Sequence, residues 1–216
     1  IELPPPADLV VDVITMPPMG EVNEQISLTW TVRNDGDFAA QGSWTDAVYL
    51  SKDGTWDLGD TLLGRVNHTG GLAVGGSYTS SPLVATLPPL LAGQYRVIVR
   101  PDIFDEVFEG SDEANNVKAS ADPIAVEVPQ LHPGITLDTT LDPGESRLYR
   151  VTVGAGETLR VRLDAEDDGA STELFARLAD LPTGSAFDAA LVVALLGFVG
   201  TVALARFAER GRVGGD

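Results

Sequence analysis

Short runs in which apolar and polar residues alternate recur along the first 125 residues, separated by Gly, Pro, Asn and Asp. The clearest run is ISLTWTVR (26–33), where every second residue is apolar. Successive side chains of a strand point to opposite faces, so this period predicts a strand with one buried face. Similar runs are 8–16, 44–51, 61–66, 77–84 and 94–100. Many short strands at this spacing, without helical periodicity between them, predict an all-β sandwich over residues 7–126.

A second set of alternating runs follows this predicted sandwich. Residues 1–6 and 127–134 contain several prolines and are interpreted as linkers on either side of it. Residues 148–153 and 158–164 are predicted to pair as a hairpin, and residues 172–178 to add one more strand. Three or four strands are too few to close a sandwich. Residues 135–188 are therefore predicted to form a partial second β unit.

An uncharged apolar run occupies residues 189–205 and is followed by Arg206, Arg210 and Arg212. As a helix this run would extend about 26 Å, close to the thickness of about 30 Å of a bilayer's hydrocarbon core. The basic tail 206–216 behind an acidic amino-terminal portion follows the positive-inside rule. These features predict a single transmembrane helix with a cytoplasmic tail and extracellular β units. The alternative is a buried core helix.

Charge and composition exclude several classes of protein. The chain carries 32 acidic and 14 basic residues, a net charge of −18, which disfavours binding to nucleic acid. It has no cysteine, which excludes disulfide scaffolds and thiolate metal sites. The two histidines, His68 and His132, lie far apart, and no nucleophile triad, phosphate loop or zinc-protease motif is present. A non-catalytic segment is predicted, and a start at Ile1 without Met suggests a longer precursor.

Four segments carry a resemblance to a known family. They are ADLVV (7–11), LTWTVRNDG (28–36), WTDAVYLSKDGTWDLGDTLLG (44–64) and VFEGSDEANNV (107–117). Together they resemble CARDB, the cell-adhesion-related domain found in bacteria. The resemblance implies an immunoglobulin-like antiparallel sandwich, used as a repeated module in bacterial surface and secreted proteins without known catalysis.

The second unit resembles another bacterial module. The segments LDPGESRLYRVTVGAGETLRVRLD (141–164) and ELFARLADLPTGSAFDA (173–189) are similar to the beginning of a pre-peptidase C-terminal (PPC-like) domain. Such a domain implies a small β-sandwich on a secreted protein. The similarity stops at Ala189, so either this sandwich is truncated or the sequence is joined or cut there.

Two acidic loops are candidate calcium sites. In the first, Asp53, Asp57 and Asp60 lie within eight residues, with Asp46 nearby in sequence. Calcium binds six to eight oxygen atoms from carboxylates and carbonyls, and one turn can supply both kinds. The spacing is not that of an EF-hand. The alternative interpretation is an acidic turn in which Asp is favoured by turn geometry.

The second acidic loop spans residues 102–116. Its acidic residues are Asp102, Asp105, Glu106, Glu109, Asp112 and Glu113, followed by Asn115 and Asn116. Like charges at this density repel each other, so the loop is either neutralised by a cation or exposed to water. Four residues are predicted calcium ligands: Asp102, Glu109, Asp112 and Glu113. In the alternative, the loop is solvated and an asparagine holds a turn.

Aromatic residues supply the remaining candidates for binding. Trp56 lies in the first acidic loop and is the predicted contact for a ligand, whereas Trp30 and Tyr95 on alternating strands fit core positions. Tyr95 is also a candidate tyrosine corner.

The predicted function is an extracellular adhesion or spacer module at a bacterial cell surface. Its partner would be a protein or carbohydrate ligand, and residues 189–205 would contact the membrane. The alternative is an accessory region of a secreted protease or glycosidase whose catalytic domain lies outside this segment.

Overall fold

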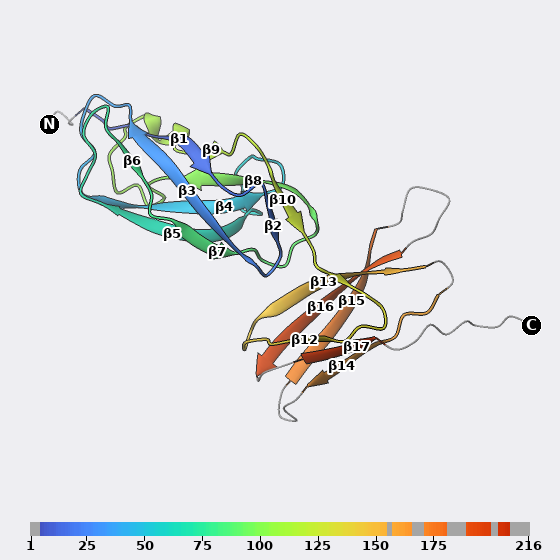
Figure 1. Ribbon diagram of the computed structural model, residues 1–216. Helices are drawn as coiled ribbons and strands as arrows, with labels where there is room; N and C mark the ends of the chain where they lie inside the picture. Colours follow the sequence, from blue (N-terminus) through green and yellow to red (C-terminus); the bar gives the residue numbers. More distant parts are fainter. Residues whose placement is uncertain (1–4, 155–156, 166–170, 181–188, 200–202, 208–216) are drawn as a thin grey trace, which may run out of the picture. The chain divides into compact units, whose positions relative to one another are not determined.

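The computed structural model describes residues 5–154, 157–165, 171–180, 189–199 and 203–207 (Figure 1). These residues divide into two compact units, with the boundary between Glu127 and Val128 and with residues 88–91 grouped with the second unit. Within the described residues, the regular structure is strand apart from one short 3-10 helix, η1 (Asp112–Asn115). The all-β prediction is confirmed.

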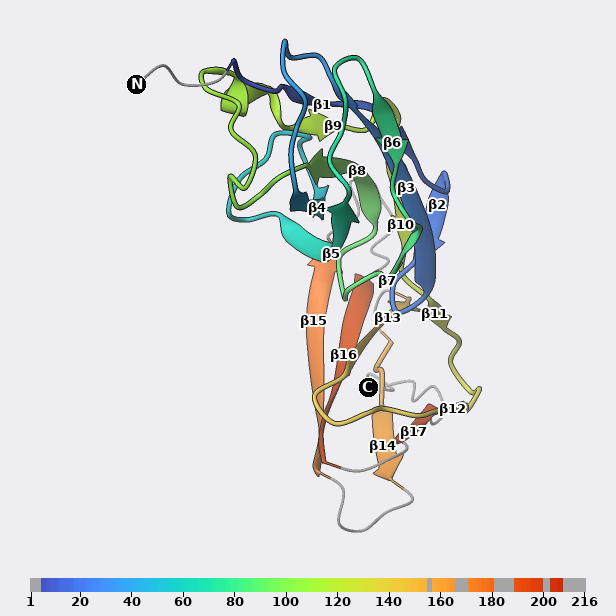
Figure 2. The same cartoon turned by 90° about the vertical axis from the view of Figure 1, so that its left-hand side faces the viewer.

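The first unit consists of two sheets, seen stacked in Figures 1 and 2. The smaller sheet contains β1 (Leu9–Thr15), β3 (Gln25–Asn34), β6 (Ser77–Thr79) and β7 (Leu83–Thr86). The larger sheet contains β2 (Met19–Glu21), β10 (Ile124–Glu127), β8 (Gly93–Arg100), β4 (Ser43–Ser51), β5 (Thr61–Thr69) and β9 (Lys118–Ala119). All pairs are antiparallel except β2 with β10, which run parallel.

Strand β3 forms as its alternating sequence predicts. Its inward side chains, each at most 5% exposed, are Ile26, Leu28, Trp30 and Val32. The run at 77–84 was predicted as one strand, but it divides into β6 and β7. Pro82 lies between the two and has no N–H to donate to a ladder, so pairing stops there.

The second unit also contains two sheets. One has the order β11 (Gln130–Leu131), β13 (Ser146–Val153), β16 (Ala189–Val199) and β15 (Ser171–Asp180). The other has the order β12 (Leu137–Thr139), β17 (Ala203–Phe207) and β14 (Val161–Ala165). Its small core contains Leu131, Leu141, Tyr149 and Val151. Strand β11 lies inside the segment interpreted as a linker, and pairs with β13.

The predicted hairpin between residues 148–153 and 158–164 is wrong. Strand β13 pairs with β11 and β16, whereas β14 pairs with β17. Short-range sequence favours a hairpin, but the β13 to β16 ladder runs from Ser146 opposite Leu196 to Val153 opposite Ala189. That ladder satisfies backbone groups along the whole of β13, which the shorter β14 would not.

The helix predicted over residues 189–205 is not found in the part of that segment that the structure describes, which is strand. Residues 189–199 form β16, which pairs with β13 on one edge and β15 on the other, and residues 203–207 form β17. A continuous apolar run is typical of a strand covered on both faces as well as of a helix, and periodicity does not separate them. Among the described residues, no helix has the length and apolar character needed to cross a membrane. Most of the predicted basic tail, residues 208–216, lies outside the described residues.

Candidate functional site

The first acidic loop connects β4 to β5, and its carboxylates bind its own backbone. Asp53 Oδ1 accepts a hydrogen bond from the N–H of Thr55 at 2.8 Å. Asp57 Oδ1 accepts one from the N–H of Gly59 at 2.6 Å, and Asp60 Oδ2 accepts one from the N–H of Asp57 at 3.1 Å. Each carboxylate therefore holds a turn, as the alternative interpretation of this loop proposes.

Asp46 does not join this loop but lies between the two sheets. It is 1% exposed, and its Oδ2 accepts hydrogen bonds from Trp30 Nε1 and from the Tyr78 hydroxyl, both at 2.7 Å. Tyr78 in turn accepts a hydrogen bond from Trp44 Nε1 at 3.1 Å. Burial raises the pKa of Asp46, and the hydrogen bonds from Tyr78 and Trp30 partly offset this rise. The network ties β3, β4 and β6 together.

Trp56, the predicted ligand contact, is half-buried. The Arg100 guanidinium carbon lies 3.9 Å from the centroid of the Trp56 ring, a cation–π arrangement. The Tyr49 ring meets Trp56 edge-on at 6.1 Å. One face of Trp56 is therefore occupied by β8 and its edge by β4. Its role in binding stays a prediction, as does the tyrosine corner at Tyr95, which is buried in β8.

The second acidic loop divides its four predicted ligands between buried and surface positions. Asp102 and Glu109 are buried, at 2% and 0% exposed. Asp112 is half-buried and Glu113 is exposed, both in η1. Asn116, immediately after η1, is 7% exposed. The loop thus combines buried and surface oxygen atoms.

Asp102 organises the start of this loop. Its backbone has φ of +46°, in the left-handed region. Its Oδ1 accepts a hydrogen bond from the N–H of Glu106 at 2.9 Å, and its Oδ2 accepts one from the N–H of Val107 at 2.8 Å. Burial raises the pKa of Asp102, and these two N–H groups lower it. The carboxylate therefore acts as a brace for the turn.

Glu109 is the unusual residue of the loop. Among the residues that the structure describes, neither of its carboxylate oxygens has a hydrogen-bond partner. Burial raises its pKa to about 7, with further contributions from the charges of Glu113 and Asp102. The Asn116 side chain and the Leu9 backbone favour the charged form, although neither is in hydrogen-bonding geometry. The Asn116 Oδ1 is likewise buried without a partner.

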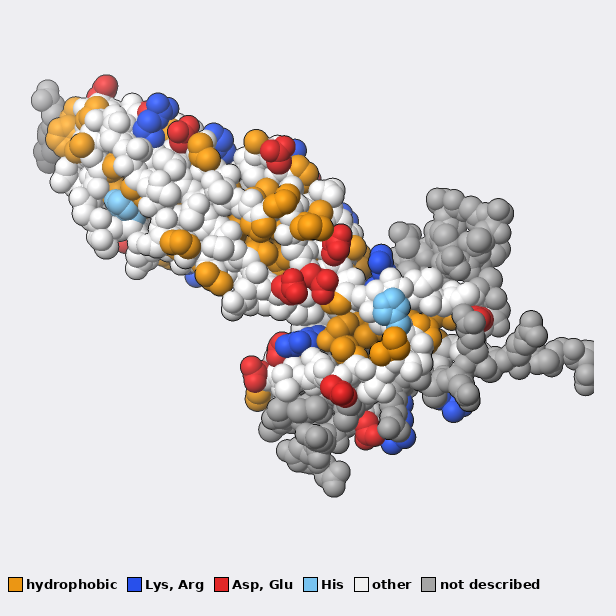
Figure 3. Space-filling model, viewed as in Figure 1, with side chains coloured by type: hydrophobic (Ala, Val, Ile, Leu, Met, Phe, Trp, Pro, Cys, Tyr) orange, Lys and Arg blue, Asp and Glu red, His pale blue; other side chains and the backbone are white. Residues whose placement is uncertain are grey.

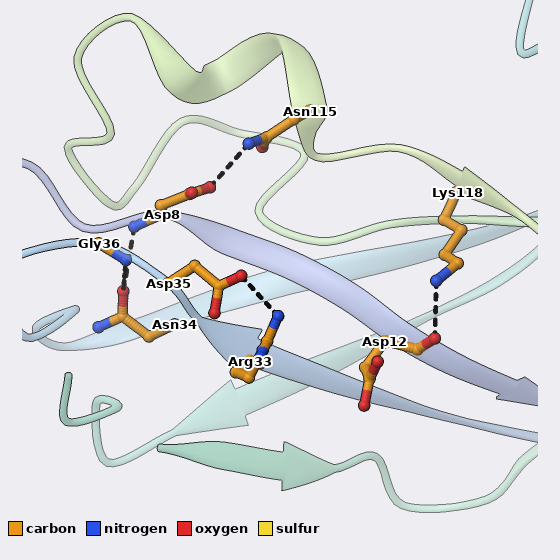
Figure 4. A network of polar contacts seen from close by, with 8 residues as sticks. All are labelled: Asp8, Asp12, Arg33, Asn34, Asp35, Gly36, Asn115 and Lys118. Atoms are coloured by element: carbon orange, nitrogen blue, oxygen red, sulfur yellow. Dashed lines mark hydrogen bonds and ion pairs between the residues drawn. The ribbon is translucent and has the colours of Figure 1, made fainter. Parts of the chain in front are cut away.

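The same loop holds the first residues of β1. The N–H of Ala7 donates to the carbonyl of Phe108 at 3.2 Å. Asn115 Nδ2 donates to Asp8 Oδ1 at 2.9 Å, and Lys118 Nζ donates to the carbonyl of Asp12 at 2.7 Å (Figure 4). Strand β9, which carries Lys118, lies beside β1 in both Figures 1 and 2. The 102–118 segment thus fastens the edge strand β1.

Asn34 completes the attachment of β1 from the other side. Its Oδ1 accepts hydrogen bonds from the N–H groups of Asp8 and Gly36, both at 3.1 Å (Figure 4). Its Nδ2 donates to the carbonyls of Phe38 at 2.8 Å and Leu72 at 3.1 Å. The side chain is fully buried, and its four bonds join three separate segments.

These contacts leave calcium binding untested. Among the described residues, no three His, Asp or Glu side chains gather as a metal site. A cation bound there would need amide or backbone oxygens in addition to carboxylates. The calcium sites therefore stay predictions.

Comparison with known families identifies the family of the first unit. The family model CARDB matches residues 6–120. The chain belongs to the CARDB family. The CARDB resemblance expected from the sequence is confirmed, and at the coarse level the family is one of non-catalytic, adhesion-type modules. The resemblance of the second unit to a PPC-like domain stays a prediction. A second model, multiple resistance and pH regulation protein F (MrpF/PhaF), matches residues 179–209.

Solved structures similar to this chain include two of one CARDB domain. The crystal structure of the CARDB domain of PF1109 from Pyrococcus furiosus, in complex with di-metal ions, is 24% identical, with a TM-score of 0.40, covering 56% of this chain and 89% of that one. The solution NMR structure of the same domain has the same identity, TM-score and coverage of this chain, and 95% of that chain is covered. A β-glucosidase from Listeria innocua in complex with isofagomine is 17% identical with a TM-score of 0.37, covering 56% of this chain and 16% of that one. No curated protein matches the chain.

Several functional side chains of the CARDB domain were not predicted. The sequence Asn34-Asp35-Gly36 is typical of a turn. Nothing in it indicates that the Asn34 side chain accepts the N–H of Asp8, 26 residues away. The buried partners of Asp46 come from β3 and β6, and local patterns do not reveal such pairs. The acidic pattern of residues 102–116 predicted Glu109 and Glu113 as ligands, but it did not indicate that Glu109 is buried or that Asn116 is buried beside it.

Proposed function

We propose that the CARDB domain is an extracellular adhesion or spacer module of a bacterial cell-surface protein. The observation that supports this is that several polar side chains of the domain form hydrogen bonds with its own backbone. Asn34, Asp53 and Asp102 each bind backbone groups of their own or neighbouring loops. Loops tied in this way hold a fixed shape, which a module that presents a ligand surface or separates other domains requires.

Its partner is proposed to be a protein or carbohydrate at the cell surface. Trp56 with Arg100 offers a flat aromatic ring bearing a cation, a combination suited to both kinds of ligand. Elsewhere the surface is mixed: on the face seen in Figure 3, hydrophobic and charged side chains of the first unit are interspersed among other side chains and backbone. The proposed contact is therefore local.

Calcium is proposed to stabilise the domain through the second acidic loop. The first loop is a weaker candidate, because Asp53, Asp57 and Asp60 already accept backbone hydrogen bonds. In the second loop, both oxygens of Glu109 have no such partner.

Protease treatment of intact cells tests the surface assignment. The native protein, carrying an epitope tag in the CARDB domain, is expressed in its own host, and intact and lysed cells are treated with an impermeant protease. Loss of the epitope from intact cells is expected. Loss only after lysis contradicts an extracellular module. A protease or glycosidase domain in the same open reading frame would instead favour an accessory region of a secreted hydrolase.

A further inference from the structure

We infer that Glu109 and Asn116, with Glu113 beside them, bind one hard divalent cation of the calcium type, and that this cation fastens the 102–116 loop to the first residues of β1. The inference rests on the proposed calcium stabilisation and gives it a site and a structural effect. It involves residues of the CARDB domain only.

The first step is the burial of Glu109. Its side chain is fully buried, and among the described residues no donor is in hydrogen-bonding geometry with either oxygen, although the Asn116 side chain and the Leu9 backbone lie near. An ionised carboxylate in such surroundings is strongly destabilised unless something compensates its charge. The ion pairs among the described residues are Arg33–Asp35, Arg147–Glu145 and Arg162–Asp164, so none of them supplies this compensation. A proton or a bound cation remains.

The second step is the independent observation at Asn116. Its amide oxygen is also buried and unpartnered, and its side chain lies next to Glu109. Together the two residues present three acceptor oxygens. A single proton on Glu109 makes one O–H bond and can serve one acceptor, which leaves at least one oxygen without a partner. A cation satisfies all three, because each oxygen can coordinate it.

The third step is the type of cation. The ligands are carboxylate and amide oxygens, which hard cations such as Ca²⁺ prefer over soft ones. The carboxylates of Glu113 and Asp102 add negative potential at Glu109. Calcium accepts irregular sets of six to eight oxygens, including backbone carbonyls and water. A site with few carboxylates therefore suits Ca²⁺ better than a transition metal.

The fourth step is the position of the site. Glu109 lies beside the backbone of Leu9, and its neighbours Phe108 and Asn115 bind Ala7 and Asp8. A cation held by Glu109 would therefore order both the loop and the start of β1. Its binding should protect these backbone amides from exchange.

Calorimetric titration of the chelator-stripped, full 216-residue chain with CaCl2 tests the inference. We expect saturable binding, and a rise in Tm of about 5–10 °C at a hundredfold excess of ion over Kd. Hydrogen exchange of residues 7–9 and 102–116 should slow on addition of CaCl2. No heat and no change in Tm for the unmutated chain overturns the inference.

Variants locate the site. Glu109→Gln should weaken calcium binding by about 100-fold or more, because it removes a ligand and not only a neighbour of a ligand. Asn116→Leu should weaken calcium binding by at least about tenfold. This variant tests the site if E109Q does not fold. Asp57→Asn, in the first acidic loop, should leave binding unchanged.

The possible outcomes are distinct. If calcium raises the Tm of the unmutated chain and of both E109Q and N116L equally, the proposed calcium stabilisation is supported, but calcium does not bind at Glu109 and Asn116. If D57N loses calcium binding and E109Q keeps it, calcium binds in the first acidic loop, and the inference is overturned. None of these results bears on the surface assignment, which the protease experiment measures separately.

Discussion

Trp30 and Asp46 lie on facing sheets and are joined by a hydrogen bond of 2.7 Å from the indole Nε1 to Oδ2. The bond is enclosed by the core, since each residue is 1% exposed. A buried carboxylate that accepts from an indole and a phenol fixes how the sheets align. Burial of the Asp46 carboxylate between the sheets disfavours its charged form, and therefore raises the pKa of Asp46.

Asp46→Ala should destabilise the domain by about 2–4 kcal/mol, because it leaves Trp30 Nε1 and the Tyr78 hydroxyl buried without an acceptor. Urea unfolding followed by tryptophan fluorescence measures this. Tyr78→Phe removes one of the two donors to Asp46 and also the acceptor of the Trp44 indole N–H, and should cost about 1–3 kcal/mol. A change within 0.5 kcal/mol for D46A, a threshold of about the size seen at surface positions, would show that the network is dispensable.

Stability in the presence of chelator should fall as pH rises from about 4.5 to about 7. The pKa of Glu109 is about 7 in the folded chain, above the ordinary value of 4.5. The folded chain therefore binds more protons than the unfolded chain in this window, and stability decreases with rising pH. The contribution is at most about 3 kcal/mol.

Urea unfolding at pH 5 and pH 8 compares the chain with Glu109→Gln, which mimics the protonated side chain. The difference in pH dependence between the two reports Glu109 together with its coupling to the charges of Asp102 and Glu113. Asp46, whose pKa is also raised, is present in both chains. Identical pH dependence would mean that Glu109 is already charged in the folded chain at pH 5.

Asn34→Ala should destabilise the domain by about 2–4 kcal/mol. It removes four hydrogen bonds and leaves the buried N–H and carbonyl groups around it without partners. Thermal unfolding by circular dichroism measures the loss. The control is Asn67→Ala, since Asn67 is exposed and its side chain, within the described part of the chain, bonds Thr45 alone, at 3.0 Å. Equal effects of the two variants would contradict the assigned role of Asn34.

Gly36→Ala should lower the free energy of unfolding of the domain by at least about 1–3 kcal/mol, since an added Cβ would lie 2.5 Å from the backbone carbon of Ala7. The neighbour is backbone, so relief requires β1 to move. Gly93→Ala is the matched control, because there the added Cβ would meet only the Tyr95 ring at 3.7 Å. The two variants are compared by their urea midpoints. Wild-type stability in G36A would mean that the start of β1 is not held as described.

Features set by local sequence could be predicted, and features set by distant partners could not. The alternation of β3 gave its buried face, and the Asp-rich turn after β4 followed from turn chemistry. The environment of Glu109 depends on Leu9 and Asn116, which approach it only after folding. Residues 189–199 form a strand because they pair with β13 and β15. An apolar run of this kind can form either a strand or a helix, and its sequence alone does not distinguish the two.

The parallel pairing of β2 with β10 has a mechanical consequence. These strands lie near the two ends of the CARDB domain and match Met19 with Ala125 and Glu21 with Glu127. If the domain is pulled by its ends, the strands slide along each other in opposite directions, so the load falls on all their hydrogen bonds at once. The N–H of Val22, which donates to the carbonyl of Glu127 at 2.9 Å, shares that load. Extension of the domain through this pair of strands should therefore require their hydrogen bonds to break together and not one after another.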